Sequence, residues 1–474
     1  MLKLIPTLTI FFATLTAHAS PLDVFNADPS RRDGHTLRLL QTGKDLDTAR
    51  DQAILAAKQS IYISTYVLHN DPSGVHTAKL LCKKAVQGLD VRLYSFHMST
   101  ETILGFDDAE KKLGDRLQRC GVKVLFFEPM KWSMNASTWA NALHEKLLII
   151  DAKTVFTGGN NYGNHYSHYS RDSETWYDLD VEVTGPVACL FQKRFNESWA
   201  RAARNSTWGI AGDSMGGLGG SSPGSSQANL DDLAERLYRI KSLKKCSPKK
   251  AETTLVPIAV DSAVSPTSDV INDSFIPVLN NPLWSDDRPA MKHYIDLIHA
   301  SQKHIVLFAP YFVPEDPCKE GSPCAEVSNG ESISDALIDA VKRGVNVEVI
   351  TNSPESNDES NSITIATYQK APHLIDAGVK IYIWQKKSVF HKKGGLFDEE
   401  VAFLGSDNFD GRGQNYSSES IVLTSSALVI STLKDDLIWE RDHIKLLTVD
   451  DVDAYLSTIS KSKKWLVKKL QPLY

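Results

Sequence analysis

The sequence predicts an α/β protein made of two similar lobes, on the strength of two observations. Three segments in which a helical pattern leads into an apolar strand recur in the same order: 56–66, 83–95 and 119–127, then 300–311, 339–351 and 376–384. A Gly/Ser-rich segment at 211–227, with too few apolar side chains to pack, divides the two halves. Helices that alternate with strands indicate βα units and largely parallel sheets, so each half is predicted to be an α/β/α lobe related to the other by a pseudo-twofold axis.

The matched elements can be followed along the chain. The first pair combines a helix end with an apolar strand. In the second pair, Gly88 and Gly344 follow a helical pattern, and alternating apolar residues then begin a strand. Gly121 and Gly378 do the same in the third pair. We therefore place a first lobe at 20–208, a flexible linker or loop at 209–229 and a second lobe at 230–474.

A fourth match carries polar residues. HEKLLIID, from His144 to Asp151, taken alone fits a buried strand with polar ends equally well, because Leu147 to Ile150 form a short apolar run. HKKGGLFD, from His391 to Asp398, repeats its spacing, with Lys393 in the place of Lys146. The agreement continues downstream, with the same spacing from each aspartate to a pair of small residues and an asparagine: Gly158, Gly159 and Asn161, then Gly405, Ser406 and Asn408. A fortuitous strand would not recur together with its turn.

This pattern suits a phosphate. In a strand His144 and Lys146 point to one face, where the ammonium can clamp a phosphate and the imidazole can attack or protonate it. The small residues and the amides, namely Gly159, Asn161, Ser406 and Asn408, would let a substrate approach the backbone and would bind it. Two copies packed together would place two histidines on opposite sides of one phosphorus, one as nucleophile and one as acid and base. The lysines and amides would stabilise the charge, so we expect neither a metal nor another cofactor.

Each histidine also needs a carboxylate that fixes its tautomer. Glu419 opens a strand after the second copy and is the clear candidate there. After the first copy, Asp178, Asp180 and Glu182 share one face of a strand, with Asp178 at its start, and the pattern leaves open which of them reaches a histidine. Asp151 and Asp398 complete the two motifs, and we expect them to brace the local fold or the lysine.

The N-terminus and the charge limit the setting. Lys3, an apolar stretch at 4–16 and the small-residue pattern ending at Ala19 predict a cleavable secretory signal at 1–19; the alternative, an uncleaved anchor, would need an apolar run of ~20 residues. We therefore expect a periplasmic or secreted protein. A net charge of -6 argues against a protein that coats nucleic acid. In an oxidising compartment the six cysteines can pair, with Cys318 and Cys324 the favoured pair and the remaining connectivity open.

The paired HxKxxxxD motifs, each followed by G[GS]xN, resemble the phospholipase D superfamily from about residue 37 to the C-terminus. The resemblance implies two α/β/α lobes, an active site at their interface and a phosphohistidine mechanism without a metal. The segments at 309–316, 405–412, 176–186 and 191–199 are most similar to bacterial cardiolipin synthases and their secreted phospholipase D relatives. By this resemblance His144 is the nucleophile and His391 the acid and base, while Lys146, Lys393, Asn161, Ser406, Asn408 and Glu419 match catalytic or phosphate-binding positions.

The sequence also departs from those synthases. Gly413 and Ser417 stand where they have a serine and an asparagine, which puts transfer to a lipid alcohol in more doubt than phosphodiester cleavage. The leading hypothesis is an exported phospholipase D or phosphatidyltransferase acting on a glycerophospholipid. The alternatives are a nuclease or other phosphodiesterase of the superfamily, and a pseudoenzyme that binds phospholipid without turnover.

The expected partners follow from the leading hypothesis: the lipid, a peripheral membrane contact and no nucleic acid, with the protein a monomer. The basic and aromatic stretch 460–474 fits either an interface with anionic lipid or a terminal helix packed on the second lobe. Trp132, Trp139 and Tyr162 fit either a substrate entrance or, more simply, core packing.

Overall fold

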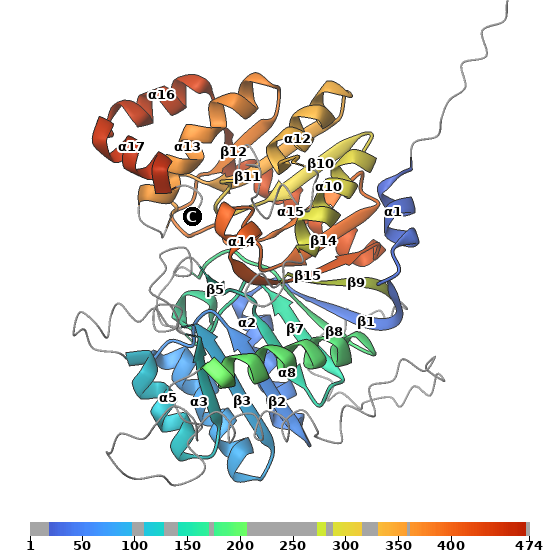
Figure 1. Cartoon of the computed structure of the whole chain (residues 1–474), viewed down its shortest axis with the longest axis vertical. Coiled ribbons are helices and arrows are strands. Elements are labelled where there is room, and N and C mark those ends of the chain that lie inside the picture. The colour runs from blue at the N-terminus through green and yellow to red at the C-terminus, as the bar shows by residue number, and fades with distance from the viewer. Residues whose placement is uncertain are drawn as a thin grey trace, which may run out of the picture.

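The computed structural model describes residues 19–96, 109–127, 141–169, 175–205, 273–280, 288–314, 330–357 and 361–470. Two lobes lie one above the other in Figure 1, the first in blue and green and the second in yellow to red. The predicted signal at 1–19, except Ala19, and the linker at 209–229 lie outside the described residues, as do Trp132, Trp139, Cys318 and Cys324.

The first half of the chain contributes the following elements: α1 (Pro21–Ala27), β1 (Arg32–Leu40), α2 (Gly43–Ala56), β2 (Ser60–Thr65), α3 (Pro72–Val86), β3 (Asp90–Phe96), α5 (Ala109–Arg119), β4 (Lys123–Phe127), β5 (Ala142–Leu143), β6 (Leu147–Ile150), β7 (Thr154–Gly158), η1 (Asn164–Tyr166), β8 (Asp180–Thr184) and α8 (Val187–Asn205).

The second half contributes β9 (Asp273–Asn280), α10 (Pro289–Ala300), β10 (His304–Phe308), α12 (Ile333–Lys342), β11 (Asn346–Asn352), α13 (Asn361–Asp376), β12 (Lys380–Trp384), β13 (Gly394–Phe397), β14 (Val401–Gly405), α14 (Gly411–Asn415), β15 (Ser417–Thr424), α15 (Ala427–Glu440), η3 (Arg441–His443), β16 (Ile444–Leu446), α16 (Val449–Ser457) and α17 (Lys461–Leu470).

One continuous sheet of 16 strands runs through both lobes. Its order is β16-β12-β11-β10-β13-β14-β15-β9-β1-β8-β7-β6-β2-β3-β4, and β5 pairs with β15 beside this path. The first strands of the two halves, β1 and β9, pair antiparallel at the centre of the sheet, so the pseudo-twofold axis passes between them. The two-lobed α/β prediction is confirmed, and the lobes share a sheet as well as an interface.

The prediction of largely parallel sheets is wrong. Parallel pairing along the sheet path joins β2 to β3 to β4 and β10 to β11 to β12, which are the repeated helix-strand units. The strands that follow each motif histidine pair antiparallel: β8 pairs with β7 after a longer connection, whereas β6 and β7, like β13 and β14, are joined by turns of three residues. A short connection cannot return the chain to the same edge for parallel pairing, so these strands reverse direction.

The predicted ends of the repeated helices are confirmed. Gly88, Gly121, Gly344 and Gly378 all have positive φ, between 90° and 98°. Each therefore ends a helix in the left-handed conformation that glycine adopts without a steric penalty, and the next strand begins two residues later.

Three apolar cores hold the helices on the sheet. One lies between the first lobe's sheet and α2, α3 and α5, and includes Ile54, Leu81 and Leu117. Another lies under α10 and α12 in the second lobe. The third runs across both lobes on the opposite face and is covered by α8, with Phe191, and by α15, with Leu433. The two halves therefore share a core, which fixes their relative position.

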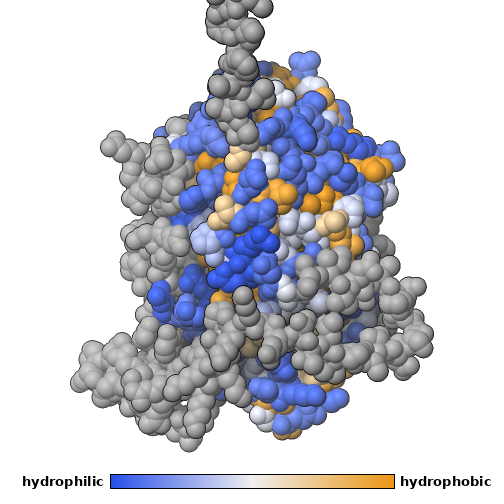
Figure 2. All heavy atoms as spheres, turned by 90° about the vertical axis from the view of Figure 1, so that its right-hand side faces the viewer, coloured by the Kyte–Doolittle hydropathy of each residue, from blue (hydrophilic) through white to orange (hydrophobic). Residues whose placement is uncertain are grey.

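Helix α1 precedes the first lobe in the chain but packs on the second. Its Phe25 is buried in the core of α10 and α12. The helix is capped by Ser20, and Leu22 N donates to Glu400 Oε2 over 3.2 Å. By its contacts α1 belongs to the second lobe, and the first lobe begins at β1. Figure 2 views the molecule from the α1 side and shows hydrophobic residues interspersed with hydrophilic ones.

A disulfide joins Cys82 in α3 to Cys120 after α5, and Cys189 is also disulfide-bonded. Tyr162 is buried, as core packing predicts. Among the described helices, none is both long enough and apolar enough to span a bilayer.

Candidate active site at the lobe interface

The two motif histidines are carried by segments that cross from one lobe to the other. β5 pairs in parallel with the start of β15, and His144 N donates to Ser418 O over 3.1 Å. In the reciprocal crossing, Phe390 bridges to Tyr177, and His391 N donates to Tyr177 O over 2.8 Å. The backbone of each histidine is thus hydrogen-bonded to the opposite lobe: His144 near the start of β15, and His391 to the segment that leads into β8.

The histidines exchange carboxylates across the interface. His144 Nδ1 lies 2.8 Å from Glu419 Oε1 and 3.1 Å from Oε2. His391 Nδ1 lies 2.5 Å from Asp178 Oδ2. The structure thereby settles which acidic residue reaches a histidine. Asp180 instead pairs with Arg50, and Glu182 pairs with Arg38, so their side chains are engaged elsewhere.

The strand register explains the choice of Asp178. Gly158 of β7 pairs with Asp180, and its counterpart Gly405 of β14 pairs with Ile421. Asp178 and Glu419 each stand two residues before these partners, so they occupy equivalent places. Counting back from the residue opposite each motif glycine would identify Asp178 from the sequence, but that register requires antiparallel pairing, which the helix-strand repeat does not indicate.

The two lysines are buried beside the histidines. Lys146 Nζ donates to His144 O over 2.7 Å, and Lys393 Nζ donates to His391 O over 2.6 Å. Burial, opposed by Glu419 and assisted by Lys393, lowers the pKa of Lys146 to about 7. Since a lysine of one copy acts on the lysine of the other, both motifs belong to one electrostatic unit.

Burial and nearby cations shift the pKa values of His144 and of the two carboxyl groups. Desolvation, followed by Lys146, Lys393 and Arg412, holds the pKa of His144 well below its usual value. Burial raises the pKa of Asp178 to about 6 and the pKa of Glu419 well above its usual value. His144 is therefore neutral at neutral pH. A neutral imidazole whose Nδ1 faces a carboxyl group presents its Nε2 on the other side of the ring.

The side chains of the two histidines differ in exposure, 15% for His144 and 6% for His391. Aromatic rings surround both. Tyr66 meets the His144 ring edge-on, with centroids 5.4 Å apart, and stacks on Phe96. Trp176 lies 5.0 Å from the His391 ring. These walls reduce water contact at the reacting atoms.

Comparison with known proteins agrees with this geometry. The family model "Cardiolipin synthase, PLD-like domain" matches residues 51–199 and 294–441, more than half of the chain and both lobes. The chain belongs to this family. The predicted membership of the phospholipase D superfamily and the prediction of an enzyme are confirmed, and the coarse function is that of a PLD-like phosphatidyltransferase family.

Individual relatives have low sequence identity to this chain but match most of its length. The chain is 22% identical over 415 residues to cardiolipin synthase A of Pseudomonas entomophila, covering 88% of this chain and 70% of the relative. It is 22% identical to the cardiolipin synthase of Halalkalibacterium halodurans, covering 86% of this chain and 66% of the relative. The crystal structure of phosphatidylserine synthase from Haemophilus influenzae shares the fold, with a TM-score of 0.59, 16% identity and 92% of both chains covered.

The motif aspartates of this PLD-like chain hold the backbone. Asp151 accepts hydrogen bonds from the N–H groups of Lys58, Gln59 and Ser60 at 2.7–2.9 Å. Asp398 accepts the corresponding three bonds from residues 302–304, at 2.7–2.9 Å. Both aspartates have positive φ, 53° and 52°, in the tight turn after the strand. Their contacts tie that turn to the start of the first parallel strand of each lobe, on the far side of the apolar run from the histidine.

The asparagines of the two PLD-like motifs are buried near the site. Asn161 accepts from Thr65 Oγ1 over 3.2 Å and donates to the Tyr166 hydroxyl over 3.1 Å. Asn408 is 7% exposed, and its Oδ1 has no hydrogen-bond partner among the described residues. Ser406 Oγ donates to Glu419 Oε2. The side-chain hydrogen bonds of Asn161 and Ser406 thus help to position the site.

The structure gives glycine at 159 a reason of its own, beside the predicted approach of a substrate. A Cβ at Gly159 would lie 2.4 Å from both carboxylate oxygens of Asp178, and a Cβ at Gly158 would lie 2.1 Å from Asp180 Oδ1. The small pair is needed because acidic side chains of β8 and its lead-in pack against the backbone there.

We expect Gly159→Ala to impair catalysis more than Ser406→Ala does. The alanine methyl displaces the Asp178 carboxylate from His391, which should lower kcat by roughly 10²-fold, within the range that general acid-base groups contribute. Ser406→Ala removes one hydrogen bond to Glu419 without adding an atom, so a smaller loss is expected. Steady-state kinetics with thermal unfolding curves would measure both; equal kcat values for Gly159→Ala and the wild-type enzyme would contradict the steric argument.

Some residues of the PLD-like site were not foreseen. Arg50 donates to the carbonyls of Asn160 and Asn161 and to Asp180, so it fixes the turn that bears Asn161. Arg412, from the second lobe, lies 5.7 Å from the Phe96 ring of the first and lowers the pKa of His144. Arg50 has no spacing signal, because it acts across a distance in sequence that only the fold closes. Arg412 ends the segment 405–412, but its contact with the first lobe likewise depends on the fold.

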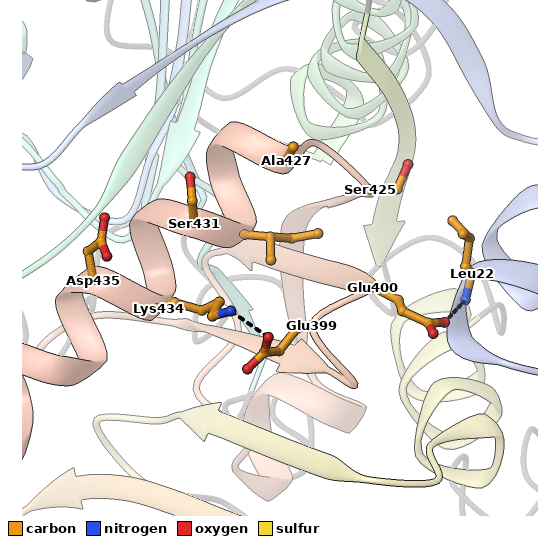
Figure 3. A pocket seen from close by; sticks show the side chains of 9 residues that line it. Leu22, Glu399, Glu400, Ser425, Ala427, Ser431, Lys434 and Asp435 are labelled. Atoms are coloured by element: carbon orange, nitrogen blue, oxygen red, sulfur yellow. Dashed lines mark hydrogen bonds and ion pairs between the residues drawn. The ribbon is translucent and has the colours of Figure 1, made fainter.

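A surface pocket of about 640 Å³ lies elsewhere, between α1, α15 and the turn after β13. Figure 3 shows that Lys434 and Glu399 pair across it and that Glu400 reaches the backbone of Leu22. Neither motif histidine lines this pocket. It lies where α1 contacts the second lobe. In the described parts of the chain, no group of three or more His, Cys, Asp or Glu side chains is placed to hold a metal ion.

Proposed function

We propose that this chain is an exported phospholipid phosphodiesterase or phosphatidyltransferase that acts through a phosphohistidine intermediate. The observation that carries the proposal is the pair of histidines, each held through Nδ1 by a carboxyl group of the opposite lobe. That pairing orients two Nε2 atoms for one transfer reaction. The substrate class is supported by the names of the relatives, which are cardiolipin synthases, and by the family model.

The first half-reaction forms the covalent intermediate. His144 Nε2 attacks the phosphorus of a glycerophospholipid, the bond from phosphorus to the headgroup oxygen breaks, and His391 donates its Nε2 proton to the leaving alkoxide. Lys146 and Lys393 stabilise the charge on the non-bridging oxygens. The imidazole of His144 becomes cationic as the P–N bond forms, and the Glu419 carboxylate beside Nδ1 stabilises that charge.

The second half-reaction reverses these roles. Neutral His391 takes the proton of an incoming water or alcohol, whose oxygen attacks phosphorus on the face opposite His144. The P–N bond breaks and releases phosphatidic acid or a new phosphodiester. Asp178 stabilises the imidazolium of His391.

His144 is the better nucleophile of the two. Its pKa is held low, so the ring carries no proton on the attacking nitrogen at neutral pH. Its side chain is also more exposed than that of His391, 15% against 6%, which favours contact with the phosphorus of a bulky substrate.

Product analysis tests the proposal. The purified protein would be incubated with phosphatidylglycerol, phosphatidylethanolamine and short DNA, with and without ethanol. We expect phosphatidic acid or a transferred lipid from the phospholipids, and phosphatidylethanol when ethanol is present. Cleavage of DNA alone would indicate a nuclease of the same superfamily. Lipid binding without any product, unaffected by His144→Ala, would indicate a non-catalytic protein.

The pH profile of kcat/KM should be bell-shaped. Asp178 must be a carboxylate to support His391, and its raised pKa of about 6 makes activity fall as the pH drops through that value. Lys146, with a lowered pKa of about 7, loses its charge above that pH, so phosphate binding weakens on the alkaline side. Kinetics between pH 5 and 9 would measure both limbs. Lys146→Arg keeps its charge and should shift the alkaline limb to higher pH; an unshifted limb would contradict this assignment.

Export is part of the proposal. The signal-like N-terminus and the disulfide between Cys82 and Cys120, a bond that persists in oxidising compartments, support it. Cell fractionation followed by N-terminal sequencing would test it. We expect a mature chain that begins at Ser20 in the periplasm or the medium, and a full-length chain in the cytoplasm would count against export.

A further inference from the structure

We propose that α17 is a docking surface through which the second lobe binds an anionic phospholipid membrane. The inference rests on the proposed function, and it names the part of the chain that brings the lobe-interface site to its substrate. α17 carries five lysines in ten residues, namely Lys461, Lys463, Lys464, Lys468 and Lys469, and no acidic residue. The whole chain has a net charge of -6, so this basic helix runs against the overall balance.

The helix also exposes large apolar side chains. Trp465 is 63% exposed and Leu466 is 49% exposed, although neither contributes to a core. Val467 is 2% exposed and packs in a small cluster with Val313 and Ile365. α17 is therefore fixed to the lobe along one side, and its large apolar residues face outward.

The spacing of the exposed residues makes one continuous face. Lys461, Trp465 and Lys469 are four residues apart, so they lie above one another on the same side of the helix. Val467 is two residues from Trp465, about 200° further around the helix, which turns the buried contact away from this face. A tryptophan between two lysines matches the boundary of an anionic bilayer, where the ring inserts at headgroup level and the ammonium groups meet lipid phosphates.

A short chain of contacts connects α17 to the candidate active site. Val313, under Val467, bridges to Asp410; its N–H donates to Phe409 O over 3.2 Å, and its carbonyl accepts from Gly411 N over 3.1 Å. This loop directly follows the motif asparagine Asn408. Figure 1 shows α17 at the outer edge of the upper lobe and α14, which begins at Gly411, toward the lobe interface.

A lipid surface fits these features better than a nucleic acid does. Lysines alone suit either polyanion, but Trp465 and Leu466 gain most by leaving water for an apolar phase, which a phosphate backbone does not offer. The neighbouring helix α16 carries Asp450, Asp451 and Asp453. Its charge would repel the same membrane, so the basic face of α17 would approach the membrane first.

Vesicle sedimentation tests the proposal. Full-length protein would be mixed with sucrose-loaded vesicles of phosphatidylcholine, with or without 30% phosphatidylglycerol (roughly the anionic content needed for a strong surface potential). We expect binding to the anionic vesicles and little to the neutral ones. Trp465→Ser and the double variant Lys461→Gln/Lys469→Gln should each weaken it, the double variant by about tenfold or more.

A matched control uses two exposed lysines of the same lobe, Lys292 on α10 and Lys342 on α12, changed together to glutamine; its binding should equal that of the wild type. Vesicle binding that the α17 variants leave unchanged would overturn the proposal. So would α17 variants that bind vesicles like the wild type but lose binding to a short DNA.

Activity on a monomeric short-chain phospholipid separates this inference from the proposed function. The α17 variants should keep wild-type rates on that substrate and lose rate only on vesicles. If the wild type binds anionic vesicles through α17 but turns over neither form, the proposed function fails and the docking surface stands. If the wild type turns over both forms and the α17 variants are unaffected on vesicles, the docking surface fails and the function stands.

Discussion

His144→Asn is expected to abolish turnover of every phosphodiester substrate, whereas His391→Asn should keep one fast step. The nucleophile is needed whatever the leaving group, so its loss should lower kcat by at least about 10³-fold. The acid is needed only when the leaving oxygen must be protonated. With phosphatidyl-p-nitrophenol the leaving group departs as a stable anion, and the His391 variant should release it once per enzyme.

The measurement is a rapid-mixing experiment on both variants. For His391→Asn we expect a burst of p-nitrophenolate close to one equivalent, followed by very slow turnover, because the second half-reaction lacks its base. Intact mass spectrometry should then find the phosphatidyl adduct on His144. A burst in the His144 variant with an adduct on His391 would exchange the two roles. The Glu145→Gln variant, altered in a motif residue that bonds to Ser64 instead of to a histidine, serves as the control.

The repeat itself could be predicted from the sequence because it is local. Helix-ending glycines such as Gly88 and Gly344 leave a signal within a few residues, and the structure has them in the left-handed conformation. The recurrence of the spacing around His144 and His391 likewise needs no knowledge of the fold. A pattern of this kind identifies the residue types that the chemistry needs, and the structure brings the predicted histidines, lysines and carboxylates into one electrostatic unit.

The pairing of those residues could not be predicted, because it depends on contacts between the lobes. β5 is two residues long and pairs with β15, which lies far along the chain. Sequence order places an acidic residue downstream of each motif but does not say which histidine it reaches; in the structure Glu419 contacts His144 and Asp178 contacts His391. The same limit hid the role of Gly159, whose missing side chain makes room for Asp178.

The exchanged carboxylates lead to the second large expected effect. Glu419→Gln should slow formation of the phosphohistidine with every substrate, because a neutral amide cannot stabilise the cationic imidazole that forms on attack. Asp178→Asn should slow the steps in which His391 gives or takes a proton, and so should spare the first release of p-nitrophenolate. Each change is expected to lower kcat on a natural phospholipid by roughly 10²- to 10⁴-fold.

The crossed geometry also predicts which double variants are additive. Glu419 acts through His144, so Glu419→Gln in a His144→Asn background should cost almost nothing more, and Asp178→Asn should likewise add little to His391→Asn. If each carboxylate served the histidine of its own lobe, the opposite pairs would show this non-additivity. Single-turnover rates of the four double variants, with thermal unfolding to check that each folds, therefore distinguish the crossed arrangement from the uncrossed one. A crossed pattern would mean that neither lobe alone contains a complete histidine and carboxylate pair, and that half-chains would be inactive until they assemble.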